Sequence, residues 1–248
     1  MTIKVGVLGA KGRMGSTSVK AITAADGLEV VAEIDVDGSL DTLTDAGAQV
    51  VLDFTQPDVA LDNVRWCVER GLHVVVGTSG FDDAKIAEVG ALLSHAPDVG
   101  VLIVPNFSIG AILMMKFAAE AAPWFESVEV IEMHHPNKVD APSGTATRTA
   151  EVIAASREAA GSAALPDATT TDPDGARGAK VAGVPVHALR ARGYVASQEV
   201  ILGGAGETFS IRHDSHDRES FMPGVIAALR SVPDRPGLTI GLDTVLGL

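Results

Sequence analysis

The segment richest in side chains that could do chemistry spans residues 129–150, EVIEMHHPNKVDAPSGTATRTA. Two adjacent histidines, His134 and His135, lie a few residues before Lys138. Histidine accepts or delivers a proton near neutral pH, and a lysine beside a cationic neighbour gives up its proton more readily. The group is therefore typical of acid–base catalysis.

An anion site is predicted a few residues further on, where Ser143 is a good N-cap for a helix. Gly144 and Thr145 then occupy the helix N-terminus, whose backbone N–H groups and dipole hold a carboxylate or phosphate. Glycine at position 144 lets a ligand approach the backbone closely. Together with the histidines and the lysine, this site predicts an anionic substrate that must be protonated.

Three elements have to position these groups. Residues 128–133 are rich in β-branched and apolar side chains and predict a strand. Neighbouring side chains on a strand point to opposite faces, so His134 and His135 need not share a role. Residues 136–141 form a polar loop that carries Lys138, and a helix follows. The alternative is that both histidines merely end a strand and that Ser143 only caps a helix.

A glycine-rich turn opens the chain. Residues 3–8 predict a buried strand, and a Gly-x-x-Gly-x-x-Gly turn from Gly9 to Gly15 leads into a helix ending near residue 25. Glycines in this context allow a tight turn and bring a pyrophosphate close to a helix N-terminus, so the turn is a variant of the dinucleotide fingerprint.

Residues in and near this turn indicate which dinucleotide cofactor the site accepts. Asp35 ends the predicted strand at 28–34, where an acid binds the adenosine ribose. The alternative is a turn residue before Gly38. Lys11 and Arg13 could reach a 2′-phosphate, although they could also be solvated surface charges. With Asp35 also present, we predict that the site accepts both NADH and NADPH.

Strands and helices continue to alternate. Strands at 49–55, 73–76 and 100–104 are separated by helices at 57–70 and 82–94. This alternation predicts an α/β fold with a Rossmann-type, doubly wound parallel sheet. Ligands bind at the carboxyl ends of such strands, unless the segments there are plain strand-to-helix turns. The candidate nicotinamide-side contacts are Gly77, Thr78, Ser79, Val104, Pro105, Asn106 and Phe107.

The second half of the chain has a different pattern. A helix at 109–122 is followed by the histidine segment and by residues 161–183, which predict a long, mobile surface loop. Strands at 184–190, 196–202 and 207–212 then follow one another directly. Such neighbouring strands predict a second, α+β domain built on a mixed sheet. A last helix in SFMPGVIAALRSV is expected to return to the first domain.

We therefore expect residues 1–107 plus 218–248 to form a dinucleotide-binding domain and residues 108–217 to form a substrate-binding and oligomerisation domain. Arg218 could clamp a carboxylate. His213 and His216 have no cysteine or glutamate at ligand spacing, so no metal site is predicted.

Composition limits the class of protein. The net charge of −13 argues against nucleic acid and anionic membranes as partners. No apolar run is long enough for a membrane span, and the N-terminus leads straight into a strand, so no signal peptide is expected. The single cysteine, Cys67, cannot form an internal disulfide, which favours the cytoplasm.

Five motifs resemble one family. The segments GVLGAKGRMG, VVGTSGF, VPNFSIGA, EMHHPNKVDAPSGTA and PGL…VLGL look like the 4-hydroxy-tetrahydrodipicolinate reductase (dihydrodipicolinate reductase) family, most of all its actinobacterial branch. The resemblance covers the whole chain. It implies reduction of a cyclic dicarboxylate by NADH or NADPH in the diaminopimelate route of lysine biosynthesis, by a homotetramer assembled through the second domain's sheet.

The resemblance also implies residue roles. His134 corresponds to a proton donor and acceptor, and Lys138 to the proton donor. His135, Gly144 and Thr145 correspond to substrate contacts, and Arg218 corresponds less securely to a further one. The implied cofactor contacts are Gly9, Ala10, Lys11, Gly12, Arg13, Met14 and Asp35, together with residues 77–79 and 104–107.

Two other functions stay open at this point. A different two-domain nicotinamide oxidoreductase, such as an aspartate dehydrogenase-like enzyme, would not need the set of His134, Lys138, Gly144 and Thr145. A non-catalytic nucleotide sensor would need a partner-binding or DNA-binding module, which the acidic chain does not show.

Overall fold

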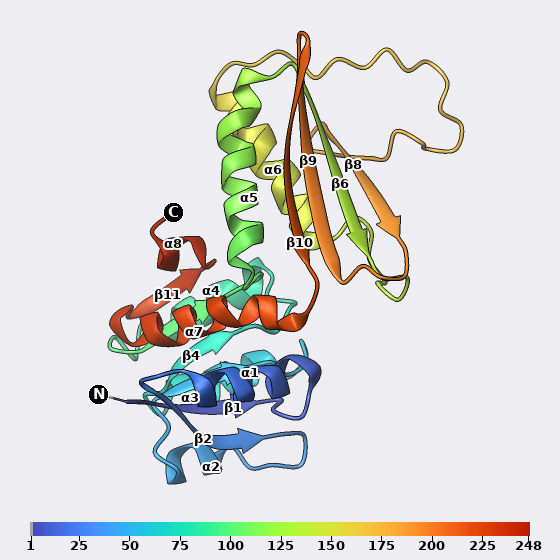
Figure 1. The fold of residues 1–248 in the computed structure, drawn as a ribbon. Helices are drawn as coiled ribbons and strands as arrows, with labels where there is room; N and C mark the ends of the chain where they lie inside the picture. The colour runs from blue at the N-terminus through green and yellow to red at the C-terminus, as the bar shows by residue number, and fades with distance from the viewer. Residues whose placement is uncertain (1) are drawn as a thin grey trace. The chain divides into compact units, whose positions relative to one another are not determined.

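The computed structural model describes residues 2–248, which fold into two compact units (Figure 1). The first unit contains the residues up to Ile109 together with Phe221–Leu248, and the second contains Gly110–Ser220. The expected α/β fold, with a parallel N-terminal sheet and a mixed second sheet, is confirmed. The roles assigned to the two domains stay predictions. Every helix within residues 2–248 is too short or too polar to span a lipid bilayer.

The first unit is a parallel sheet with the strand order β11-β5-β4-β3-β1-β2. Three inner strands of this sheet, VVLD, HVVV and GVLI, are almost entirely buried, as expected where both faces of a parallel sheet are covered. The strands are β1 (Ile3–Leu8), β2 (Leu28–Ile34), β3 (Val50–Asp53), β4 (His73–Val76), β5 (Gly100–Ile103) and β11 (Gly237–Ile240).

Helices cover this sheet in two pairs, α1 against α7 and α3 against α4. Right-handed crossovers that run in opposite directions from the centre place the two pairs on opposite faces. The helices and 3₁₀ segments are α1 (Arg13–Ala24), α2 (Asp41–Asp45), α3 (Ala60–Val68), α4 (Asp83–Leu93), α7 (Met222–Ser231), η3 (Val232–Asp234) and α8 (Asp243–Leu246).

One helix start in this unit was predicted wrongly. The sequence placed Pro57 near the first position of a helix, but α3 begins at Ala60. The backbone N–H groups of Val59 and Ala60 both donate to the carbonyl of Gln56, so a turn precedes the helix. Three further elements of this unit, β11, α2 and α8, were not predicted from the sequence.

The second unit is a mixed sheet with the strand order β10-β9-β6-β8-β7, and α5 and α6 cover one of its faces (Figure 1). Strands β6 and β8 are parallel, and the other pairs are antiparallel. Val130, Val200 and Ile153 are fully buried in the core between this sheet and α6. The elements are α5 (Ile109–Ala121), η1 (Ala122–Trp124), β6 (Ser127–His134), α6 (Gly144–Ala159), β7 (Ala179–Val181), β8 (Val184–Arg190), β9 (Ala196–Gly204), β10 (Glu207–Ser215) and η2 (Arg218–Phe221).

The long loop predicted at 161–183 is partly wrong, because it contains β7. Strand β7 pairs with β8 through a turn in which Ala182 and Gly183 have φ values of 48° and 85°. Two consecutive positive φ values are typical of the tight turn of a β-hairpin. The segment before it, residues 162–178, is fully described and contains neither helix nor strand.

Candidate active site

His134 is the last residue of β6, and Glu132 lies two residues earlier on the same face of the strand. The Glu132 side chain is fully buried, and its Oε2 lies 2.5 Å from His134 Nδ1. Parallel pairing of β6 with β8 places Arg190 level with His134. The Arg190 guanidinium donates to both carboxylate oxygens of Glu132, at 2.7 and 2.8 Å. The buried negative charge is therefore paired, as burial requires.

These contacts fix the charge states of the pair. Burial alone would raise the pKa of Glu132, but hydrogen bonds from Arg190 and His134 outweigh it and hold the pKa below 4.5. Burial lowers the pKa of His134 below 6.5, and Glu132 offsets this only in part. At neutral pH the carboxylate is ionised and can only accept, so Nδ1 of the neutral imidazole donates to it and Nε2 is left as an acceptor.

Lys138 lies in the loop after β6, where its backbone N–H donates to the carbonyl of His135 at 3.2 Å. Its Nζ donates to both carboxylate oxygens of Asp140, at 2.8 and 3.0 Å, and this lowers the pKa of Asp140. Arg190 donates to the Asp140 carbonyl at 2.8 Å as well as to Glu132. One arginine therefore joins the strand that carries His134 to the loop that carries Lys138.

The same carboxylate reaches the start of α6. The backbone N–H of Ser143 donates to Glu132 Oε1 at 3.1 Å, and Ser143 Oγ accepts from the Ala146 N–H at 3.2 Å, as an N-cap does. Gly144 is the first helical residue and is exposed, and a methyl group added to it would meet no atom within 4 Å outside its own turn. Thr145 is half-buried. A ligand therefore has room to approach this helix end.

His135 carries an unusual nitrogen. Its Nδ1 is buried and, within residues 2–248, has no hydrogen-bond partner. A buried polar atom without a partner costs free energy unless a ligand or water satisfies it. The substrate contact predicted for His135 stays a prediction, because this nitrogen is not accessible to a ligand in the structure.

The remaining predicted substrate residue, Arg218, opens η2 just after β10 and is half-buried. His213 lies on β10, where its ring packs against the Cα of Gly110. Across residues 2–248, no group of three or more His, Cys, Asp or Glu side chains is arranged to hold a metal ion.

The glycine turn after β1 suits a dinucleotide. Gly9 has a φ of 73°, and a Cβ there would lie 2.5 Å from the carbonyl oxygen of Phe54. A Cβ on Gly15 would lie 2.0 Å from the carbonyl oxygen of Gly9. The N-cap of α1 is Gly12, and no side chain in the described part of the turn caps it. The helix start is thus left open to the phosphates of a ligand.

Asp35 braces this turn from the end of β2. Its Oδ1 accepts from the Val36 N–H at 3.0 Å and its Oδ2 from the Lys11 N–H at 2.8 Å, and these two bonds lower its pKa. The side chains of Lys11 and Arg13 are exposed. Both are therefore accessible to a cofactor phosphate. Met14 is half-buried and Ala10 is buried.

The loops after β4 and β5 lie next to each other. The Val104 N–H donates to the Val76 carbonyl at 2.8 Å. A Cβ on Gly77 would lie 2.1 Å from the ring of Phe54 and 2.8 Å from that of Phe107. The two rings meet edge to face with centroids 5.5 Å apart. The structure therefore brings Gly9, Gly77 and Phe107 together around Phe54.

A buried carboxylate missed by the sequence analysis holds one of these loops. Asp53, fully buried at the end of β3, accepts from Thr78 Oγ1 at 2.7 Å. It also accepts from Thr55 Oγ1 at 2.7 Å and from Asn63 Nδ2 at 2.8 Å. The hydroxyl of Thr78 is thus engaged by Asp53, which holds the start of the loop after β4 in place. Ser79 and Pro105 are exposed, and Asn106 Oδ1 accepts from the Ser108 N–H at 2.8 Å.

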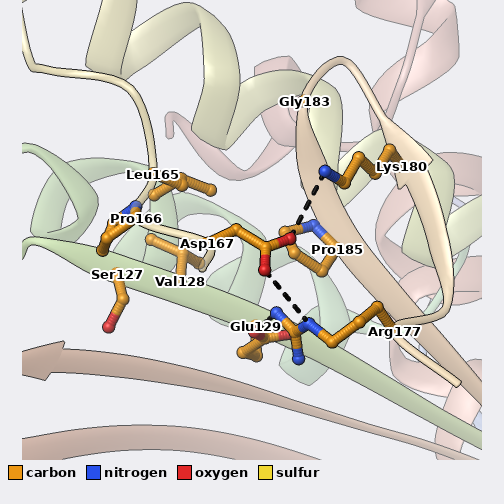
Figure 2. A pocket seen from close by; sticks show the side chains of 10 residues that line it. All are labelled: Ser127, Val128, Glu129, Leu165, Pro166, Asp167, Arg177, Lys180, Gly183 and Pro185. Atoms are coloured by element: carbon orange, nitrogen blue, oxygen red, sulfur yellow. Dashed lines mark hydrogen bonds and ion pairs between the residues drawn. The ribbon is translucent and has the colours of Figure 1, made fainter. Parts of the chain in front are cut away.

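A small cavity lies elsewhere in the second unit, beside the start of β6 (Figure 2). Its volume is about 30 Å³, enough for roughly one water molecule. Its charged groups are paired, with Arg177 2.6 Å from Glu129, and with Lys180 3.4 Å and Arg177 3.9 Å from Asp167. None of the predicted site residues lines it, so it is not a candidate for the active site.

Comparison with known proteins agrees with this geometry. Residues 3–107 match the family model for the N-terminus of dihydrodipicolinate reductase, and residues 110–246 match the model for its C-terminus. The chain belongs to the dihydrodipicolinate reductase family. A 4-hydroxy-tetrahydrodipicolinate reductase from Thermobifida fusca is 61% identical, with 99% of this chain and 100% of the relative covered. One from Nocardia farcinica is 58% identical, with both chains covered completely. The predicted family and its actinobacterial branch are confirmed.

A solved structure supports the fold. A dipicolinate-bound dihydrodipicolinate reductase from Paenisporosarcina sp. TG-14 superimposes with a TM-score of 0.86 at 35% identity, covering 98% of this chain and 99% of that one. Both units of this family member are therefore accounted for, and the aspartate dehydrogenase-like and sensor alternatives are set aside.

Proposed function

We propose that this family member reduces 4-hydroxy-tetrahydrodipicolinate with a hydride from NADH or NADPH, and that His134 and Lys138 handle the proton. The reductase activity in the diaminopimelate route of lysine biosynthesis follows from the family and from relatives matched over their full length. The observation that carries the residue roles is the Glu132 network, which joins His134, the Lys138 loop and the N-terminus of α6.

The two protein groups divide the proton chemistry. A bound nicotinamide would supply the hydride to the unsaturated ring of the substrate, and loss of the 4-hydroxyl group as water would complete the conversion to tetrahydrodipicolinate. Lys138 then delivers the proton where negative charge develops, with Asp140 orienting its ammonium group. His134 is neutral at pH 7 and presents Nε2 as an acceptor, so it receives a proton more readily than it gives one.

The substrate carboxylates are held by a different set of groups. One carboxylate lies on the α6 N-terminus at Gly144 and Thr145, where the helix dipole favours an anion. His135 is assigned to a contact with the substrate, and Arg218 is assigned to the second carboxylate. A relative solved with bound dipicolinate, a cyclic dicarboxylate, supports a substrate of this chemical class.

Residues at the carboxyl edge of the first sheet would hold the cofactor. The glycine turn would bind its pyrophosphate, Asp35 would bind the adenosine ribose, and Lys11 and Arg13 would bind the 2′-phosphate of NADPH. Residues 77–79 and 104–107 contact the nicotinamide end. The homotetramer built through the second unit's sheet and the cytoplasmic location stay predictions.

Binding of dipicolinate tests the substrate site. Gly144→Ala adds a methyl group where no protein atom stands in the way, so the variant keeps its fold while the methyl group blocks the ligand. Calorimetry with dipicolinate should show affinity weakened by about tenfold or more, which corresponds to roughly 1.4 kcal/mol. The matched control is Gly90→Ala in α4, which also meets no atom within 4 Å and should bind like wild type. Equal affinities of Gly144→Ala and wild type would contradict the assignment.

A further inference from the structure

We infer that Glu132 is a positioning residue of the reaction, which holds His134 in the tautomer with its proton on Nδ1 and keeps Nε2 available to the substrate. The inference rests on the proposed function, because it assumes that His134 exchanges a proton. Neither the sequence analysis nor the resemblance assigned a role to Glu132.

The contacts of Glu132 converge on the proposed catalytic groups. Its carboxylate accepts from the imidazole of His134, the guanidinium of Arg190 and the backbone of Ser143. The bond from His134 lies within β6 and fixes the end of that strand. The bonds from Arg190 and Ser143 tie β6 to strand β8, with its link to the Lys138 loop, and to the helix end at Gly144.

Because Glu132 is buried and ionised, the direction of its hydrogen bond with His134 is fixed. Glu132 is 0% exposed, so water does not replace a lost partner. Opposite charges nearby keep it ionised, and an ionised carboxylate cannot donate. The hydrogen bond to His134 therefore fixes which nitrogen carries the proton, as a carboxylate does for an imidazole in other catalytic sites.

The charges that face His134 come from three elements. Glu132 lies on its own strand, Arg190 on β8, and Lys138, paired with Asp140, on the loop. Only Glu132 favours protonation of His134, while Lys138 and Arg190 oppose it. Removing the Glu132 charge should therefore move the pKa of His134 further down, away from 6.5.

The same strand offers a matched control. Glu129 also accepts from one histidine and one arginine, His187 at 2.7 Å and Arg177 at 2.6 Å. It lies on the opposite face of β6, its side chain is 29% exposed, and it lines the small cavity of Figure 2. Glu129→Gln removes a carboxylate that has an equivalent pair of partners, and it leaves the proposed site unchanged.

The first measurement is the nitrogen NMR spectrum of histidine-labelled wild-type protein, with the His134 signals assigned from their absence in His134→Gln. We expect a protonated Nδ1 and an unprotonated Nε2 at pH 8. The opposite tautomer would overturn the inference, whether or not any variant folds and whatever the activity.

The second measurement compares Glu132→Gln with Glu129→Gln. Glu132→Gln should lower kcat roughly tenfold to hundredfold, the size found for carboxylates that orient a metal-bound imidazole, while the Kd for NADH stays unchanged. The pKa of His134 should fall in this variant and stay unchanged in Glu129→Gln.

If the unpaired Arg190 prevents folding, Glu132→Gln/Arg190→Gln removes both charges. If kcat fell while the tautomer and the pKa of His134 stayed as in wild type, Glu132 would have only a structural role and the inference would be wrong.

A double variant separates this inference from the proposed function. Glu132→Gln should cause no further loss of kcat in a His134→Gln background, because the two residues act as one unit. Normal turnover by His134→Gln alone would refute the role of His134 instead. If the losses of kcat in the two single variants added fully in the double variant, the role of Glu132 in positioning His134 would be refuted.

Discussion

Two exposed basic side chains, Lys11 and Arg13, carry the proposed ability to use NADPH as well as NADH. Lys11→Ala should weaken NADPH binding by about tenfold, because a charge-assisted bond to the 2′-phosphate is lost. NADH has no 2′-phosphate, so its Kd should stay within about twofold, given the small effect of exposed charges. Titration of both cofactors checks this, with Lys20→Ala, an exposed lysine of α1, as control. Equal weakening of both cofactors would contradict the assignment.

At the residue scale the sequence indicated the groups that are close together in the chain. His134, Lys138 and Gly144 occupy one short segment, so their types and spacing were visible. Arg190 was missed because strand pairing, not sequence distance, places it beside His134. Glu132 carried a usable signal, since an acid two residues before a histidine on a strand shares its face. Asp53 was missed because its partner Thr78 follows a different strand.

At the scale of elements, the glycine turn and α1 form one unit in which a side chain at Gly15 has no room. A Cβ on Gly15 would lie 2.0 Å from a backbone oxygen, and backbone cannot move aside as a flexible side chain can. Gly15→Ala should lower the free energy of unfolding by about 1–3 kcal/mol and weaken NADH binding.

Gly90→Ala in α4 is the matched control, because open space surrounds that position. It should raise the free energy of unfolding by about 0.5–1 kcal/mol, the gain from helix propensity and from a stiffer unfolded chain. Urea unfolding measures both variants. Gly15→Ala with wild-type stability would show that the turn tolerates a side chain.

The elements that the sequence did not reveal are short and depend on distant partners. Strand β11 has four residues and is defined by its pairing with β5, more than a hundred residues earlier. Strand β7 has three residues, two of them exposed, and exists through its hairpin with β8. Long elements with regular apolar patterns, such as β1 and α6, were predicted because their signal is local.

At the scale of the whole molecule, the two family models meet between residues 107 and 110, and the compact units divide at Ile109. Each unit contains its own buried carboxylate, Asp53 in the first and Glu132 in the second, which organises the loops proposed for cofactor and substrate. Activity should therefore need both units, with cofactor binding assigned to one and proton transfer to the other.

The most direct test of this account is a coupled assay that follows nicotinamide absorbance. Pyruvate and aspartate semialdehyde are condensed in situ by the preceding synthase, and wild type, Lys138→Ala and the control Lys20→Ala are compared with NADH and NADPH. We predict synthase-dependent oxidation of both cofactors by wild type and by Lys20→Ala. Turnover should fall by about a hundredfold or more in Lys138→Ala, the size expected for loss of a positioned acid, while NADH binding survives. Near-normal turnover in Lys138→Ala, or no oxidation by folded wild-type protein, would contradict the account.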